Sequence, residues 1–438
     1  MDLAGIRGLV ETLSVNDRQE LLRWLRDSEA GRRRAERART YGATASAIFG
    51  FAAALLDRIV RLASKVGSAL RSGPATGETL RAAIVWSLVT VLIFFVSESA
   101  VFRSGLYFKY VQPESSAGQL TFQVFWLQHE LPANVPEVGV AGDSRIAEGF
   151  SARRAGLASG GRLHFWNIGV PGSSPRTWYY LLREGDPDRT RFRTVVLGID
   201  RYEDIDRTED LRDRPTDLFY VASQLRLTDC AEFADSHPDP DVRRDAWSGC
   251  LFKGIPMRRD LVDLLSAPGK RLDAARDWRN RGHGYIDGYD GKPEDLVGLS
   301  MEPTTHALSF PSVAKDWQRN SVAGTMATAF HPVPPTGAAT AYRRQWLNKI
   351  VDLYAGTKTK VVLLELPRGP IPPPESKAPA TSVSELGRRP NVTVLPREMF
   401  HDLEQPELFA DGLHLNHKGR PIFSERLGLK VSELMGVK

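Results

Sequence analysis

The longest apolar run in the chain covers positions 82–102, AAIVWSLVTVLIFFVSESAVF. As a helix rising about 1.5 Å per residue, it reaches across the roughly 30 Å hydrocarbon core of a bilayer. A buried core helix is the alternative, but such helices seldom stay apolar on every side over this length. We therefore expect residues 82–102 to form one transmembrane helix, with Glu98 at the interface or facing a partner within the membrane.

The residues before this run have helical spacing of a different kind. Residues 48–70 place apolar side chains along one side, and Asp57, Arg58, Arg61 and Lys65 interrupt the other. This pattern predicts an amphipathic helix for the membrane surface or for a partner helix. A membrane crossing within residues 43–70 stays open as the alternative, and it would put the rest of the chain on the opposite side.

After the apolar run, short apolar segments alternate with helical ones, which is typical of a parallel sheet covered by helices. We expect an α/β domain over residues 103–438, interrupted at about 201–340 by an irregular insertion that is too long for an ordinary connection. The expected strands are 137–141, 163–168, 194–199, 360–366 and 392–395, and the expected helices are 146–157, 175–183, 341–354 and 416–427.

Charge adds an orientation to this picture. The 438 residues carry a net charge of +5, and residues 1–81 hold all of that excess. Basic residues next to a span stay in the cytoplasm, so we expect a cytoplasmic segment 1–81 and a single-pass protein of the inner membrane with its α/β domain outside. Nucleic-acid binding is a poor explanation, because the excess does not belong to the folded domain.

Several classes of site have no support in the sequence. Two cysteines are too few for a zinc finger, the 9 histidines show no paired ligand spacing, and glycine-rich phosphate or dinucleotide loops are absent, so we expect no metal and no cofactor. Cys230 and Cys250 fall on the expected oxidising side and can form a disulfide there, which the sequence leaves open.

Candidate chemistry lies at the two ends of the α/β pattern. Ser144 follows the first expected strand, where ligands reach an open parallel sheet, and Asp411 and His414 precede the last expected helix. A serine needs a base to attack a carbonyl and the base needs an acid to orient it, and these three residues supply that set. The alternative is structural: Ser144 begins a helix, Asp411 caps one, and His414 is an ordinary histidine.

The motifs around these residues resemble the blocks of the SGNH (GDSL-like) hydrolase superfamily. VGVAGDSR resembles the block of the nucleophile, Ser144, and DGLHLN resembles the block of Asp411 and His414. NIGVPGSS resembles the glycine block, in which Gly172, or less well Gly169, would donate its backbone N–H to the oxyanion. The resemblance implies a three-layer, flavodoxin-like α/β/α domain.

The third block departs from the family's pattern. Asp200 stands in GIDR where the family has the asparagine that donates to the oxyanion. A carboxylate accepts hydrogen bonds and repels a developing oxyanion, so Asp200 cannot simply replace the amide. The hole would then use the N–H groups of Ser144 and Gly172, helped by Arg145 or Arg201. Positioning of substrate by Asp200, slow hydrolysis and a simple turn at a strand end stay open.

The layout also resembles that of the D-alanyl transfer proteins of teichoic-acid modification. It implies an O-acyltransferase that forms an acyl-serine, with acetyl the expected group, and passes it to an envelope polysaccharide. The partner would be a membrane-bound O-acyltransferase or another membrane subunit of polysaccharide synthesis. A tethered carbohydrate esterase or deacetylase and a degenerate binding subunit are the alternatives. Aromatic side chains that could line a sugar groove, although core packing explains most such residues, are Trp247, Trp278, Tyr285, Tyr289, Trp317 and Trp346.

Overall fold

The computed structural model describes residues 77–204, 216–283, 289–330, 337–374 and 379–437. The cytoplasmic segment expected over residues 1–81, including the amphipathic stretch 43–70, thus lies almost wholly outside the described residues. The chain divides into two compact units, Met1–Ser97 and Glu98–Lys438.

The described part of the first unit belongs to the apolar helix. Helix α3 (Gly77–Glu98) continues into a π-helical turn, Ser99–Arg103. Residues 81–103 are long and apolar enough to cross a membrane. More than half of the surface of Ile84, Leu88 and Leu92 is exposed. A core helix of a soluble protein would bury these side chains, so the structure does not support that alternative.

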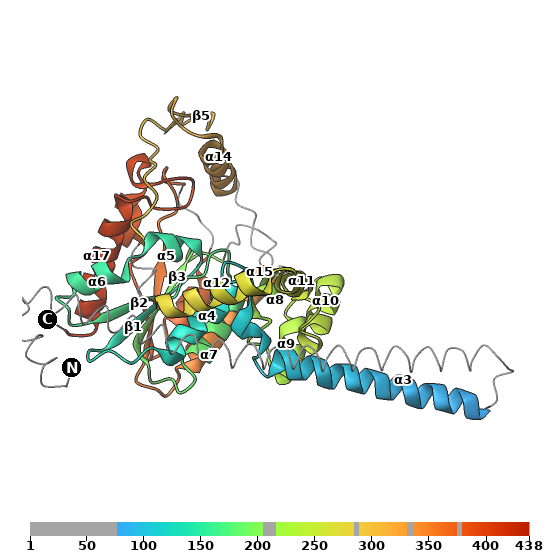
Figure 1. Ribbon diagram of the computed structural model, residues 1–438. Helices are drawn as coiled ribbons and strands as arrows, with labels where there is room; N and C mark the ends of the chain where they lie inside the picture. The colour runs from blue at the N-terminus through green and yellow to red at the C-terminus, as the bar shows by residue number, and fades with distance from the viewer. Residues whose placement is uncertain (1–76, 205–215, 284–288, 331–336, 375–378, 438) are drawn as a thin grey trace, which may run out of the picture. The chain divides into compact units, whose positions relative to one another are not determined.

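A five-stranded parallel sheet forms the centre of the second unit (Figure 1). Its strands are β1 (Glu137–Ala141), β2 (His164–Asn167), β3 (Phe192–Ile199), β6 (Lys360–Glu365) and β7 (Val392–Val394). They lie in the order β2-β1-β3-β6-β7, which is 2-1-3-4-5 when the strands of this sheet are counted along the chain. That is the flavodoxin-like order. The α/β class and all five expected strands are confirmed.

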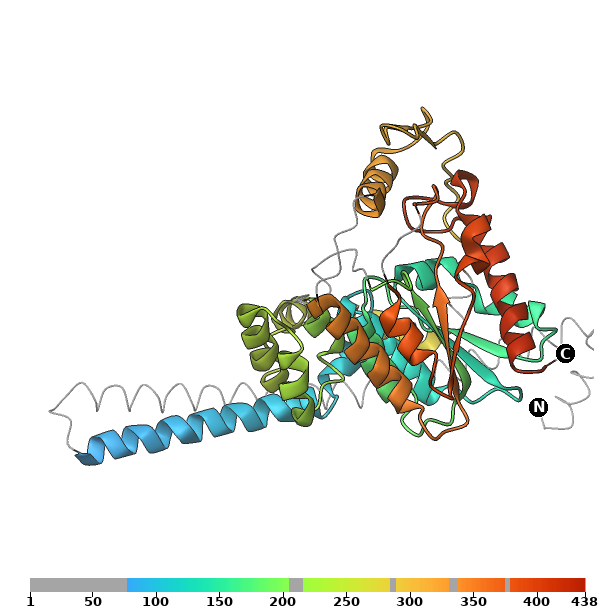
Figure 2. The same ribbon diagram turned by 180° about the vertical axis from the view of Figure 1, so that it is seen from behind.

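An apolar core covers each face of the sheet. Neighbouring residues of each strand point to opposite sides, so each strand contributes side chains to both cores. In β3, Val195 and Leu197 face one apolar core and Val196 faces the other. Helices α4 (Ser116–His129), α7 (Pro175–Gly185) and α15 (Gly337–Leu353) belong to the first core. Helices α5 (Ser144–Gly149), α6 (Ala152–Ala158) and α17 (Gly419–Leu434) belong to the second. Figures 1 and 2 show these groups on opposite sides of the sheet. Val383 and Leu386 of α16 (Thr381–Leu386) also belong to the first core.

Two helix predictions need correction. The expected helix 146–157 is two helices, because Phe150 is extended and the Ser151 hydroxyl caps α6 by accepting from the Arg154 N–H. The expected helix 416–427 begins only at Gly419, because the side chain of Asn416 accepts from the N–H groups of Lys418 and Gly419 before the helix starts.

The insertion is mostly helical rather than irregular where the structure describes it. Its elements are α8 (Thr216–Val221), α9 (Cys230–Asp235), α10 (Pro240–Leu251), α11 (Arg258–Ser266), α12 (Pro268–Arg281), β4 (Ser300–Met301), β5 (Leu308–Ser309) and α14 (Asp316–Phe330). A disulfide joins Cys230 of α9 to Cys250 of α10. Buried residues of α8 to α12 join the first core, whereas Val322 and Met326 of α14 join the second.

Candidate active site

The candidate residues gather at the carboxyl edge of the sheet, where the chain turns from β1 and β3 to opposite sides. Ser144 is the first residue of α5, three residues after the end of β1, and Asp200 directly follows β3. In this strand order the point between these two strands is where ligands bind. The fold therefore presents Ser144 at the expected place for a substrate.

Ser144, His414 and Asp411 form a continuous hydrogen-bonded chain. The Ser144 Oγ lies 2.8 Å from the His414 Nε2. The His414 Nδ1 lies 3.0 and 2.9 Å from the two carboxylate oxygens of Asp411. These distances are those of good hydrogen bonds, so the structure brings together all three residues that the motifs predicted.

The carboxylate sets the state of the imidazole. Burial disfavours the charge of Asp411, but the hydrogen bond and charge of His414, with the N–H groups of Leu413 and His414, outweigh burial and hold the pKa of Asp411 at about 2. An ionised carboxylate only accepts, so the His414 Nδ1 carries the hydrogen and its Nε2 is left to accept the proton of Ser144. This is the arrangement that general-base activation of a serine requires.

Helix α14 of the insertion holds the loop that carries the acid and the base. The Gln318 amide donates to the Ala410 carbonyl at 2.7 Å, and the Gly412 N–H donates to the Ser321 hydroxyl at 3.1 Å. A Cβ on Gly412 would lie 2.5 Å from the Ser321 carbonyl oxygen, so only glycine fits this close approach. The position of His414 thus depends on α14 as well as on the sheet.

Asp200 is paired with the residue that follows the nucleophile. The Arg145 guanidinium contacts the Asp200 carboxylate and also binds Asp143, with Nη2 and Oδ2 2.8 Å apart. Burial disfavours the charge of Arg145, but the two carboxylates outweigh it and raise the pKa of Arg145. Asp143 also caps α5 by accepting from the Arg145 N–H at 2.9 Å. The negative charge of Asp200 is therefore offset beside the nucleophile.

The loop after β2 contains both glycines that were candidate donors to the oxyanion, and the structure distinguishes between them. The Gly169 N–H donates to the Asn167 side chain at 3.1 Å and serves the fold, so Gly169 is not available as an oxyanion donor. Gly172 is partly exposed and has a φ of +69°. A Cβ on Gly172 would also lie 2.7 Å from the Tyr220 hydroxyl. Gly172 stays the candidate donor together with the Ser144 N–H.

Asn167, which the sequence analysis did not single out, ties this loop to α5. Its buried side chain donates to the carbonyls of Ile146, Ala147 and Phe150 at 2.9 to 3.1 Å. Arg201 is buried, and its carbonyl accepts from Arg343. None of the hydrogen bonds described for Arg201 reaches the triad.

A lysine from the insertion also reaches the triad. The Lys292 Nζ lies 2.8 Å from the Glu148 carboxylate and 3.5 Å from the Asp411 carboxylate. Partial burial disfavours the charge of Lys292, but the hydrogen bond that Lys292 donates to Glu148 and the charges of Glu148 and Asp411 outweigh it and raise the pKa of Lys292. No local spacing marks Lys292 or Glu148, so the sequence pattern does not predict either residue.

The expected sugar-binding aromatic residues separate into core and surface. Trp346 is fully buried, and Trp247 and Trp278 pack against the first core. Tyr285 lies outside the described residues. Trp317 has 41% of its surface exposed, and its ring lies 5.7 Å from the Lys292 Nζ. Tyr289 is half-buried, and the Arg420 guanidinium lies 5.3 Å from its ring. Of the described candidates, Trp317 is the exposed one and is the candidate ligand platform beside the triad.

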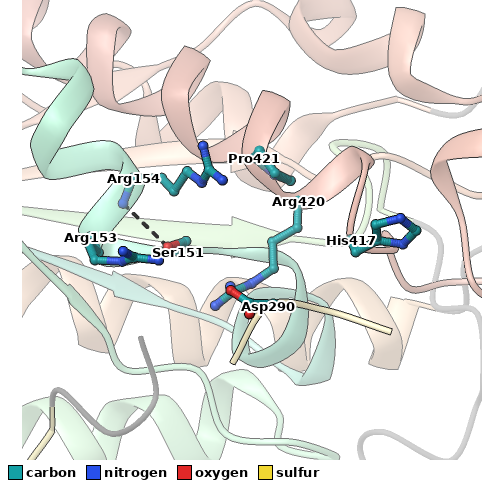
Figure 3. A pocket seen from close by; sticks show the side chains of 7 residues that line it. All are labelled: Ser151, Arg153, Arg154, Asp290, His417, Arg420 and Pro421. Carbon is teal, nitrogen blue, oxygen red and sulfur yellow. Dashed lines mark hydrogen bonds between the residues drawn. The ribbon is translucent and has the colours of Figure 1, made fainter. Parts of the chain in front are cut away.

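A pocket of about 160 Å³ lies next to the loop of His414 but does not include the triad (Figure 3). Three arginines give it a positive lining, and a histidine, together with an aspartate of the insertion, completes it. Its lining residues are Ser151, Arg153, Arg154, Asp290, His417, Arg420 and Pro421.

Comparison with known proteins does not assign the chain to a family. No family model matches the chain, and no curated protein matches it either. Within the described ranges, no group of three or more His, Cys, Asp or Glu side chains is arranged to hold a metal ion.

Proposed function

We propose that this chain is a membrane-anchored O-acyltransferase of the SGNH type that modifies a cell-envelope polysaccharide through an acyl-Ser144 intermediate. The observation that carries the proposal is the chain of hydrogen bonds from Ser144 through His414 to Asp411. The flavodoxin-like strand order and the position of Ser144 after β1 support the same family resemblance.

In the first half-reaction the Ser144 Oγ attacks the carbonyl carbon of an acyl donor. His414 takes the serine proton through Nε2 and gives it to the leaving group as the bond from carbonyl carbon to leaving group breaks. In the second half-reaction a sugar hydroxyl attacks the acyl-serine and gives its proton to His414. The Ser144 oxygen then leaves and takes that proton back, which restores the enzyme.

The oxyanion formed in each half-reaction needs donors. The Ser144 and Gly172 N–H groups are the proposed pair. Arg145 forms an ion pair with Asp200. The positive charge of Arg145 offsets the negative charge of Asp200, which would reduce the repulsion between Asp200 and the oxyanion. The missing amide donor would slow attack by water as well as by sugar, so this site would depend on acceptor binding to favour transfer.

The proposed side of the membrane is the outside. The disulfide between Cys230 and Cys250 supports this, because disulfides persist in oxidising compartments. The activated acyl group would come from a membrane-bound O-acyltransferase or another membrane subunit of polysaccharide synthesis. Trp317, exposed beside Lys292, is the proposed platform for a sugar ring of the acceptor.

The test is covalent labelling of the full-length protein with a fluorophosphonate, read by peptide mass spectrometry. We expect the label on Ser144, its loss in Ser144→Ala and strong slowing in His414→Ala. Ser384→Ala, which removes an exposed hydroxyl from α16, is the matched control and should label normally. A folded wild-type protein that takes no label at Ser144 would favour a binding subunit instead.

A second assay separates transfer from hydrolysis. With an aryl acetate as donor, we expect an acetyl adduct on Ser144 that turns over slowly in water and faster when a polysaccharide acceptor is added. Rapid release of acetate without acceptor, and no gain from acceptor, would identify an esterase.

A further inference from the structure

Helix α11 of the insertion leaves an apolar face uncovered. Ile255, just before the helix, is 47% exposed, and Val262 and Leu265 are 63% and 56% exposed. Met257 and Leu264 on the other side are buried. Val262 and Leu265 are three residues apart on α11 and so share one face of the helix, and Ile255 adds an exposed apolar side chain in the turn before it.

This face begins beside the end of the apolar helix. The Gly254 N–H donates to the Glu98 carboxylate at 3.0 Å. The Arg103 guanidinium donates to the Leu251 carbonyl at 3.1 Å and also contacts the Cys250 carbonyl. Residues 98–103 are thus bonded to residues 250–254, and Ile255 is the next residue. All of these residues belong to the second unit.

The charges on α11 suit a lipid surface. Arg258 and Arg259 are exposed in the first turn, next to Ile255 and before Val262, and Asp263 is an exposed acid directly after Val262. Asp260 in the same turn is bound by Arg271 at 2.6 Å and by the Tyr107 hydroxyl, so its charge is compensated within the fold. Apolar side chains flanked by arginines are the pattern of a helix that lies among anionic headgroups.

We infer that α11 is an interfacial helix. Its face of Ile255, Val262 and Leu265 lies in the boundary between headgroups and acyl chains of the same bilayer that residues 81–103 cross. Continuity with the end of the span selects lipid as the occupant, because residues 98–103 leave the bilayer where the segment before α11 is bonded to them. A second attachment of this kind would fix how the domain is turned toward the membrane. The inference does not depend on the chemistry of Ser144.

The test places a fluorescent label on single cysteines of the full-length protein in phosphatidylcholine and phosphatidylglycerol vesicles. The variants are Val262→Cys and Leu265→Cys on α11, Val91→Cys in the apolar helix, and Leu429→Cys on α17. Leu429, 58% exposed, is the matched control on the same domain. Labelling is done without reductant, because both native cysteines are held in the disulfide.

Lipids that carry a nitroxide just beneath the headgroup should quench the labels at positions 262 and 265 about twofold, since an interfacial helix sits roughly 5–10 Å deep. The label at Leu429→Cys should be unaffected, and the label at Val91→Cys should be quenched by nitroxides deep in the acyl chains. Labels at 262 and 265 that behave like the one at 429 would overturn the inference. So would an unquenched label at 91, which would show that the helix does not enter the bilayer. Shielding at 262 only when a second membrane protein is added would identify a protein partner instead of lipid.

Discussion

At the scale of single residues, Lys292 shows how the insertion contacts the proposed catalytic residues. Its ammonium lies 3.5 Å from the carboxylate that orients His414 and is bonded to Glu148 at 2.8 Å. A positive charge at this distance stabilises the ionised form of Asp411. Lys292 touches no reacting atom, so we regard it as a positioning residue.

We expect Lys292→Met to slow labelling of Ser144 about tenfold, because it removes the cation beside Asp411 and leaves Glu148 without this partner. Loss of the cation favours the protonated form of Asp411. The acid limb of the rate profile should therefore move to higher pH, and Lys292→Arg should restore it. Lys315→Met, which breaks an exposed pair with Glu294, is the control. An unmoved acid limb would contradict the positioning role.

Substitution of Asp200 is expected to increase an activity, the hydrolysis of an aryl acetate. Asp200→Asn removes a negative charge near the proposed oxyanion and restores an amide donor, while Arg145 keeps its bonds to Asp143. We expect hydrolysis of an aryl acetate to rise about tenfold, a fraction of what one oxyanion donor contributes. Asp200→Ala, which removes the charge without adding a donor, should gain less. A fall in both variants would mean that the pair with Arg145 is needed to shape the site.

At the scale of elements, periodicity was most informative for the strands. The residues of β1 are buried on both faces, so they read as a short apolar run, and their predicted bounds match the structure. Helix ends were less predictable, because the break at Phe150 and the late start at Gly419 depend on side-chain caps. The helices of the insertion had no clear pattern, since long-range contacts such as the buried pair of Arg176 and Asp217 help to hold them.

Some residues of the candidate site could be predicted from the sequence and others could not. Ser144, Asp411 and His414 could be found because each lies in a short motif next to an element. Asn167 and Lys292 could not, since their partners are distant in sequence and no local spacing records them. Tertiary structure alone gives these two residues a role.

The link between β2 and α5 can be tested through Asn167. In Asn167→Asp a carboxylate would face the three carbonyls to which the amide now donates. We expect a loss of about 3 kcal/mol or more in the free energy of unfolding, from lost hydrogen bonds and a buried charge. Asn167→Ala should lose less. Urea unfolding followed by tryptophan fluorescence measures both, and the reverse order would show that the carboxylate finds other donors.

At the scale of the whole molecule, the disulfide fastens two helices of the insertion. Cys230 and Cys250 are both buried and close a loop of 20 residues. The disulfide restricts the unfolded chain, and the double variant Cys230→Ala and Cys250→Ala removes that restriction. We expect this effect alone to lower the free energy of unfolding by about 3 kcal/mol. Reductant should lower the melting temperature of the wild type but not that of the variant. Equal melting with and without reductant in the wild type would contradict this stabilising role.

The proposed nucleophile and its proposed base lie 270 residues apart in the chain. A polypeptide that is still being synthesised carries Ser144 long before His414 has emerged. Until the last segment arrives and docks against the insertion, that serine is an ordinary alcohol of low reactivity. Chains that truncation or proteolysis ends before His414 would therefore not form an acyl-serine. Ser144 would react with an acyl donor only after the segment that carries His414 has been made and has folded.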